Sequence, residues 1–161
     1  MVAIDKALTG AQQRLEQLGI VLPSPPTPLG AYVEAVQSGN LVFLSGMLPV
    51  VAGVPQVLGR VGGDVTVAAG RQAAVTACLN GLAAAKEFLG SLDRVARIPK
   101  LGVYIATEGD FRDHPRVADG ASELLEQVFG ADKLSTRIVL GVSNLPLGVP
   151  IELEIVLEAR H

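Results

Sequence analysis

Apolar and acidic positions alternate near the end of the chain. From 151 to 158, apolar residues occupy every second position, and three of the remaining four residues are glutamates. Because side chains along a strand point in turn to opposite faces, this pattern predicts a strand with one apolar and one acidic face. The apolar face would hold Ile151, Leu153, Ile155 and Leu157, and the acidic face Glu152, Glu154 and Glu158.

A second apolar segment, from Ile138 to Val142, precedes this strand. A segment containing Leu-Pro-Leu-Gly-Val-Pro joins the two, which predicts neighbouring strands of a hairpin. Arg137 opens this unit. A guanidinium beside a strand-borne carboxylate can hold a small carboxylic acid and leave an acid/base group next to it. An arginine at a strand start is also often solvated or paired with a surface carboxylate, and residue spacing leaves both interpretations open.

The first part of the chain combines a helical pattern with a proline-rich segment. Apolar residues between 3 and 19 recur at spacings of three and four, which predicts an amphipathic helix that ends at Gly19. Four prolines then fall between Leu22 and Pro28, where they exclude helix and regular strand. We therefore expect residues 1–28 to form an N-terminal helix and connector, and residues 29–161 the main domain.

The middle of the chain predicts a hairpin and two helices. Apolar segments over 31–36 and 41–45 flank Ser38-Gly39-Asn40, which is typical of a hairpin turn, and residues 47–63 predict a loop. A long helix should begin at Thr66 and end at Gly90. A strand region follows over 92–105, with a bulge or late start at Pro99. After a break over 111–115, a second helix should run from about 117 to 128.

This order of elements predicts an α+β architecture, with two main helices packed on one face of a mixed or mainly antiparallel sheet. The strand segments over 101–105 and 138–142 are apolar on both sides. The second face of the sheet therefore also needs a cover, and we expect association between the sheets of several subunits to supply it.

Composition supports one domain that buries part of its surface in an assembly. The chain has 161 residues, 49% apolar and 18% charged, with a mean hydropathy of +0.42. It lacks an apolar run long enough to cross a membrane and has no signal-peptide pattern, so we expect a cytoplasmic location and no membrane partner. The net charge of −3 without a basic cluster argues against a nucleic-acid partner.

The few cysteines and histidines give no sign of a metal site. One cysteine excludes an intramolecular disulfide, and two histidines outside any Cys/His cluster provide no zinc pattern. Cys78 lies among apolar residues and is expected to be a buried helix residue rather than a nucleophile. No cofactor or metal is expected.

Several ordered motifs carry a family resemblance. They are Gly30-Ala31-Tyr32, Leu44-Ser45-Gly46-Met47-Leu48-Pro49, Leu101-Gly102-Val103-Tyr104, Asp110-Phe111, and Thr136-Arg137 through Leu145-Pro146 to Ile151-Glu152-Leu153-Glu154. With these motifs the sequence resembles the YjgF/RidA family of reactive-intermediate deaminases, also labelled endoribonuclease L-PSP. The resemblance implies a chorismate-mutase-like fold and a homotrimer whose sheets enclose a central barrel, with clefts between subunits. The N-terminal helix and connector resemble those of a longer branch.

The resemblance also implies roles for individual residues. Arg137 matches the arginine that clamps the carboxylate of a 2-imino or enamine acid, and Glu152 matches the glutamate associated with the attacking water. Tyr32 matches a tyrosine that closes the cleft, and Ser45 with Gly46 matches the pair that lines it. Two further cleft positions depart from the deaminases: Asp119 stands in place of an asparagine, and Val139 in place of a cysteine.

Three functions are compatible with these residues. The first is hydrolysis of 2-imino or enamine acids to 2-keto acids and ammonia, for which Glu152 would transfer protons. The second is non-catalytic binding of small carboxylic metabolites in the same cleft, which needs only Arg137. The third is the endoribonuclease or translation-inhibitor role that some relatives carry as a label. The acidic, aromatic-poor composition gives this last function little physical support.

Overall fold

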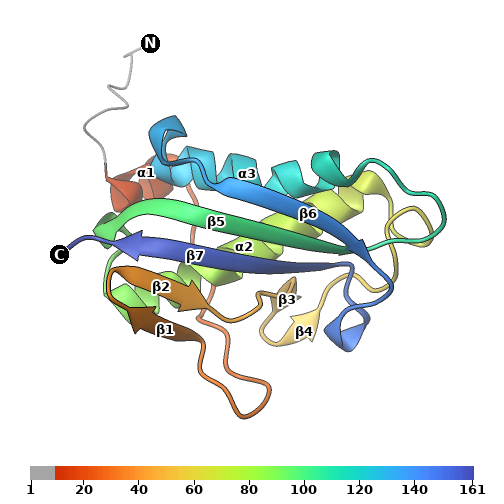
Figure 1. The fold of residues 1–161 in the computed structure, drawn as a ribbon, viewed down its shortest axis with the longest axis horizontal. Helices are drawn as coiled ribbons and strands as arrows, with labels where there is room; N and C mark the ends of the chain where they lie inside the picture. Colours follow the sequence, from red (N-terminus) through yellow and green to blue (C-terminus); the bar gives the residue numbers. More distant parts are fainter. Residues whose placement is uncertain (1–9) are drawn as a thin grey trace.

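The computed structural model describes residues 10–161. The beginning of the helix predicted over 3–19 lies outside them, and its described part is α1, Ala11–Gln17. The two main helices are α2, Val67–Leu89, and α3, His114–Phe129. Ala11 and Leu15 of α1 are buried in the same core as these helices, so α1 forms part of the packed structure (Figure 1).

The main sheet has five strands in the order β1-β2-β7-β5-β6. Its strands are β1 Ala35–Ser38, β2 Leu41–Leu44, β5 Val95–Ala106, β6 Thr136–Val142 and β7 Ile151–Ala159. β6 runs parallel to β5, whereas all other neighbours are antiparallel. The α1, α2 and α3 helices pack on this mixed sheet, which confirms the predicted α+β class and leaves the opposite face of the sheet toward the viewer in Figure 1.

The prediction that β6 and β7 are neighbours in a hairpin is wrong. β5 lies between them and pairs with both (Figure 1). Parallel strands need a crossover connection, and α3 provides it by returning the chain to run beside β5. Residues 143–150 then pass the end of β5 and place β7 on its other side. Arg137 therefore does not lie at the mouth of a hairpin.

Other boundaries follow the sequence pattern with local differences. The hairpin around Gly39 is confirmed, although its first strand begins only at Ala35. The loop predicted over 47–63 contains a two-stranded hairpin of β3, Val50–Val51, and β4, Val54–Pro55. Register shifts before Lys100 confirm the irregularity expected at Pro99.

α3 begins earlier than predicted, at His114 instead of near residue 117. The break predicted over 111–115 includes Pro115. A proline in the first helical turn lacks only an N–H that would have no partner inside the helix, so it opens α3 at little cost. The break is thus confined to the residues before His114.

Capping residues fix both ends of α2. The Thr66 side chain accepts a hydrogen bond of 3.1 Å from the Ala69 amide, and Gly90 takes the left-handed conformation that ends the helix. Cys78 is fully buried, and this burial raises the pKa of its thiol to about 12. The thiol therefore stays protonated and unreactive, which confirms the expected structural cysteine.

The two faces of the sheet differ in how they are covered. The apolar side chains predicted on one face of β7 are at most 1% exposed beneath the helices. The opposite face keeps large apolar residues in the open, at Val36, Leu41, Phe43, Ile138 and Leu140. Within residues 10–161, no helix combines the length and apolar character needed to cross a bilayer.

A first prediction concerns Asn80, a buried polar residue on α2. Its side-chain amide donates hydrogen bonds of 2.9 and 2.8 Å to the carbonyls of Leu48 and Val50. Asn80→Ala leaves both carbonyls without this donor, so the free energy of unfolding should fall by about 2–4 kcal/mol. Denaturant unfolding tests this, with the exposed Gln72→Ala on the same helix as control. Equal stability of the two variants would contradict it.

Candidate functional site

Four of the predicted site residues gather around one hollow. Tyr32, Ser45, Gly46 and Glu152 line an open cavity of about 340 Å³. The remaining lining residues are apolar and comprise Leu29, Leu48 and Pro146. A mostly apolar hollow with a few convergent polar groups is the usual form of a small-molecule site.

Backbone hydrogen bonds hold the Ser45-Gly46 segment against β7. Met47 exchanges two hydrogen bonds with Leu153, of 2.8 and 2.9 Å, as an antiparallel bridge beyond the end of β2. The Ser45 amide donates to the Glu34 carbonyl at 2.8 Å, and its hydroxyl donates to the Val33 carbonyl at 2.6 Å. The Ser45 oxygen keeps lone pairs with which it can accept a hydrogen bond from a ligand.

The absence of a side chain at Gly46 makes room for Glu152. A Cβ at this position would collide with Glu152 Oε1. Burial raises the pKa of the Glu152 carboxyl, because the surrounding protein disfavours its charged form. A carboxyl group whose pKa lies nearer to neutral can both accept and return a proton, as general acid/base catalysis requires.

Tyr32 forms an outer wall of the hollow. Its phenol oxygen accepts a hydrogen bond of 2.9 Å from the Leu29 amide, while the residue as a whole remains 46% exposed. The phenol proton is therefore available for a ligand. The cleft-closing role that the family resemblance implies for Tyr32 stays a prediction.

The other predicted site residues form a second group at the edge of the sheet. Arg137, on the edge strand β6, donates from Nη1 to Asp119 Oδ1 at 2.8 Å and to Ser122 Oγ at 3.1 Å. Asp119 and Ser122 are three residues apart on α3 and therefore share one helix face. Val139, two residues after Arg137, lies half-buried on the same face of β6.

The two groups do not meet within one chain. Arg137 pairs with Leu101 in the β5–β6 register, whereas Glu152 pairs with Tyr104 in the β5–β7 register. Leu101 and Tyr104 are three residues apart on a regular part of β5, so their side chains point to opposite faces. Arg137 thus faces α3, and Glu152 lies on the face that the helices leave open.

Sequence reasoning missed two contributors to the second group. Ser122 carries no motif signal, since a serine inside a helix is common. His114 falls within the break predicted over 111–115, but it begins α3, and its ring packs edge-on against Phe111 with centroids 5.0 Å apart. Its Nε2 lies 2.6 Å from where a Cβ at Gly141 would be, on the β6 face that carries Arg137. A glycine inside a strand often marks such a close approach, and Gly141 was that signal.

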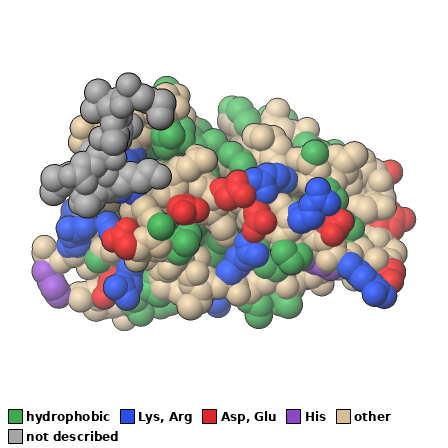
Figure 2. All heavy atoms as spheres, turned by 90° about the horizontal axis from the view of Figure 1, so that it is seen from above, with side chains coloured by type: hydrophobic (Ala, Val, Ile, Leu, Met, Phe, Trp, Pro, Cys, Tyr) green, Lys and Arg blue, Asp and Glu red, His purple; other side chains and the backbone are tan. Residues whose placement is uncertain are grey.

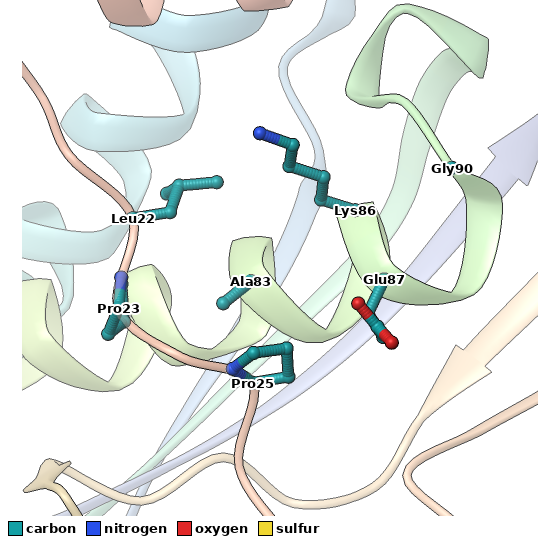
Figure 3. A pocket seen from close by; sticks show the side chains of 7 residues that line it. All are labelled: Leu22, Pro23, Pro25, Ala83, Lys86, Glu87 and Gly90. Atoms are coloured by element: carbon teal, nitrogen blue, oxygen red, sulfur yellow. The ribbon is translucent and has the colours of Figure 1, made fainter.

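A second hollow, of about 330 Å³, lies between the proline-rich connector and α2. Its connector side comprises Leu22, Pro23 and Pro25, and its α2 side comprises Ala83, Lys86, Glu87 and Gly90 (Figure 3). It contains none of the predicted site residues. Among residues 10–161, no cluster of three or more His, Cys, Asp and Glu is arranged to hold a metal ion.

A second prediction concerns the pH dependence of stability at Glu152. The pKa of the Glu152 carboxyl group is higher in the folded than in the unfolded protein. Its protonation therefore favours the folded state at acidic pH, and this contribution is lost as the pH rises through the folded pKa. The ionised group therefore destabilises the folded protein at neutral pH. Glu152→Gln removes this charge and keeps the shape, so the variant should melt at a higher temperature than the wild type at neutral pH.

The difference in melting temperature should disappear at a pH below about 4, where the carboxyl group is protonated in both states. Glu158→Gln is the matched control, since Glu158 lies on the same face of β7 and forms an ion pair with Arg97 at 3.7 Å. This control should give no increase at neutral pH. A lower melting temperature for Glu152→Gln at neutral pH would show that the fold stabilises the charged carboxylate.

Comparison with known proteins places this geometry in a family. Residues 12–156 match the family described as "YjgF/chorismate_mutase-like, putative endoribonuclease". Protein TCP17 of Trypanosoma cruzi is 36% identical over 91% of this chain and 92% of its own. A 2-iminobutanoate/2-iminopropanoate deaminase of Dermatophagoides farinae is 30% identical over 84% of this chain and 91% of its own.

A solved structure has the same fold over nearly its whole length. The protein Atu1372 of Agrobacterium tumefaciens, described as of unknown function, is 35% identical, with a TM-score of 0.83 over 92% of this chain and 91% of its own. The sequence match and the shared fold lead to one conclusion: the chain belongs to the YjgF/RidA family.

Proposed function

We propose that this protein hydrolyses 2-imino or enamine acids to 2-keto acids and ammonia, in a cleft between subunits of a homotrimer. The observation that carries the proposal is the division of the site. A carboxylate-binding group around Arg137 and an acid/base group around Glu152 lie on opposite faces of one sheet. The Arg137 group would bind the carboxylate and the Glu152 group would transfer protons, so hydrolysis needs both groups.

Two features of the sheet favour the assembly. The face that carries Glu152 also exposes a row of apolar side chains, which soluble monomers rarely leave in contact with water. The strand that carries Arg137, β6, is an edge strand whose outer backbone groups have no strand partner among residues 10–161. Packing the edge of one subunit against the open face of the next would cover both and bring Arg137 toward Glu152 of a neighbour.

The guanidinium of Arg137 has the donors that carboxylate recognition needs. Asp119 and Ser122 occupy Nη1, and the Nε and Nη2 donors have no partner among the described residues. These two nitrogens form a planar edge that can make two parallel hydrogen bonds to a carboxylate. The C2 atom next to that carboxylate would then be presented to the opposite wall of the cleft.

Glu152 can supply the proton transfers of hydrolysis. As a carboxylate it would remove a proton from water while the water oxygen bonds to C2 of the iminium acid. The resulting carbinolamine receives a proton on nitrogen, the C–N bond breaks, and ammonia leaves. Loss of the hydroxyl proton completes the 2-keto acid. Nearby donors, including the Tyr32 phenol, can hydrogen-bond to the oxygen at C2.

One relative and the distribution of charge support this chemistry, whereas the family description names a "putative endoribonuclease". The relative from Dermatophagoides farinae carries a deaminase name. Phosphate binding would need a continuous track of basic side chains. On the face seen in Figure 2, Lys and Arg side chains lie among Asp and Glu side chains. The net charge of −3 also disfavours a polyanion.

A third prediction tests the carboxylate clamp. Each charge-assisted hydrogen bond contributes roughly 1.5–3 kcal/mol, so Arg137→Ala should weaken 2-keto acid binding on the order of tenfold to a few hundredfold. Arg137→Lys should fall between this variant and the wild type, because an ammonium retains the charge but not the planar fork. Turnover of an imine generated in situ, followed as keto-acid formation, should decrease in the same order.

Oligomer mass and melting temperature serve as controls and should change little in both variants. If the arginine variants bind 2-keto acids and hydrolyse imines as well as the wild type does, Arg137 serves only its ion pair with Asp119. Binding that depends on Arg137, without any imine turnover, would support a binding protein in place of an enzyme.

A further inference from the structure

Two glutamates of β7, Glu152 and Glu154, lie on the same open face of the sheet. Side chains two residues apart on a strand point to the same side, and their Cα atoms are about 7 Å apart. β7 has β2 on one side and β5 on the other (Figure 1). The two carboxyl groups are turned toward different neighbours, and a glycine makes room for each of them.

Glu152 is turned toward the segment that follows β2, where its Oε1 occupies the place that a Cβ at Gly46 would take. Glu154 is turned toward β5, where Gly102 is its partner in the register. Glu154 Oε2 lies 3.1 Å from where a Cβ at Gly102 would be, and Cε2 of the Tyr104 ring lies 3.3 Å from the same point. Glu154 and Tyr104 therefore share the space that Gly102 leaves free.

Two hydrogen bonds hold the Glu154 carboxylate in this position. Tyr104 donates its phenol proton to Oε2 at 2.9 Å, and Lys100 donates from Nζ to Oε1 at 3.0 Å. Each oxygen of Glu154 therefore has a donor, and its charge is matched by that of the lysine. Tyr104 is the register partner of Glu152, yet its hydroxyl group is bound to Glu154.

The pKa values of the two carboxyl groups are shifted in opposite directions. Burial raises the pKa of Glu152, whereas the hydrogen bonds from Lys100 and Tyr104 lower the pKa of Glu154. Glu154 thus stays ionised over the pH range in which Glu152 gains or loses its proton. At their spacing, an unmatched charge on Glu154 would oppose the ionisation of Glu152, but the charge of Lys100 compensates it.

Other titratable groups belong to the elements around Glu152. They are Tyr32 and Glu34 from the segment before β1, Glu158 from β7 and Arg97 from β5. Burial also raises the pKa of Glu34. In the proposed assembly, Arg137 of a neighbouring subunit joins them. All of these groups stay the same when Lys100 or Glu154 is replaced, so their effects cancel in a comparison of such variants.

We propose that Lys100 is a positioning residue of the cleft, which holds and neutralises the Glu154 carboxylate so that Glu152 exchanges its proton independently of it. The inference rests on the proposed use of Glu152 as the acid/base group. Lys100 acts through Glu154 and has no contact with the substrate in this role. A carboxyl group that must accept and return a proton is thereby kept free of a like charge on the same strand face.

Three variants test this role through the pKa of Glu152. Glu154→Gln leaves Lys100 without its partner charge, so this pKa should fall by roughly half a pH unit to one pH unit. Lys100→Met leaves the charge of Glu154 unmatched and should raise it by a similar amount. The double variant has no charge at either position and should return to the wild-type value. The opposite signs distinguish this effect from a general loss of packing.

Carbon-13 NMR titration of the glutamate carboxyl groups on the intact oligomer measures the pKa, and Glu152→Gln identifies the Glu152 resonance. Arg97→Met is the matched control, because Arg97 forms an ion pair with Glu158 at 3.7 Å, six residues from Glu152 along β7. It should leave the pKa of Glu152 unchanged, since a charge at this distance is screened.

The acidic limb of the pH profile of imine turnover should move with the pKa of Glu152 in each variant. If Glu152 titrates alike in the wild type, Glu154→Gln and Lys100→Met, the inference is overturned and the proposed function stands. If the pKa of Glu152 shifts as expected but turnover is absent or does not follow it, Glu152 is not the acid/base group. The proposed function then fails at this residue, and the positioning role of Lys100 fails with it.

Discussion

The alternation of side chains along β7 is the constraint on which the rest of the structure depends. Ile151, Leu153 and Ile155 are buried under the helices, so the residues between them must point to the opposite face. Glu152 is therefore held on the open face by the same packing that forms the core. The Met47–Leu153 bridge then places Gly46 beside it, and the missing side chain at Gly46 admits its carboxyl group. The position of Glu152 and the stability of the fold therefore arise from one pattern.

The position of β5 has an equally direct consequence for function. β5 separates β6 from β7, and the β5 partners of Arg137 and Glu152 are three residues apart. One chain therefore keeps the proposed carboxylate-binding and acid/base groups on opposite faces of the sheet. The exposed apolar face of the sheet is the one that carries Glu152. In the proposed assembly, covering that face also completes the site. Catalysis would then depend on oligomer formation.

The sequence was most informative where local chemistry decides the structure. Short-range rules explain the alternation of apolar and polar residues in β7, the caps of α2 at Thr66 and Gly90, and the turn at Gly39. The pairing of β6 was not accessible in this way. Two apolar segments close in sequence suggested a hairpin, yet the connection over 143–150 is longer than most hairpin loops, and only the α3 crossover decides the strand order. The contact of Arg137 with Asp119 depends on that same crossover, so spacing alone could not reveal it.

The central claim is that Arg137 and Glu152 act together only across two subunits. The most direct test is to coexpress Arg137→Ala and Glu152→Gln chains with different tags and to purify the oligomers that carry both. In a trimeric ring that carries both variants, about one third of the clefts combine an intact Arg137 from one chain with an intact Glu152 from its neighbour. The account predicts that these mixed oligomers regain about that fraction of wild-type imine hydrolysis, although each parent variant has lost most of it. Mixed oligomers no more active than their parents would contradict a site shared between subunits.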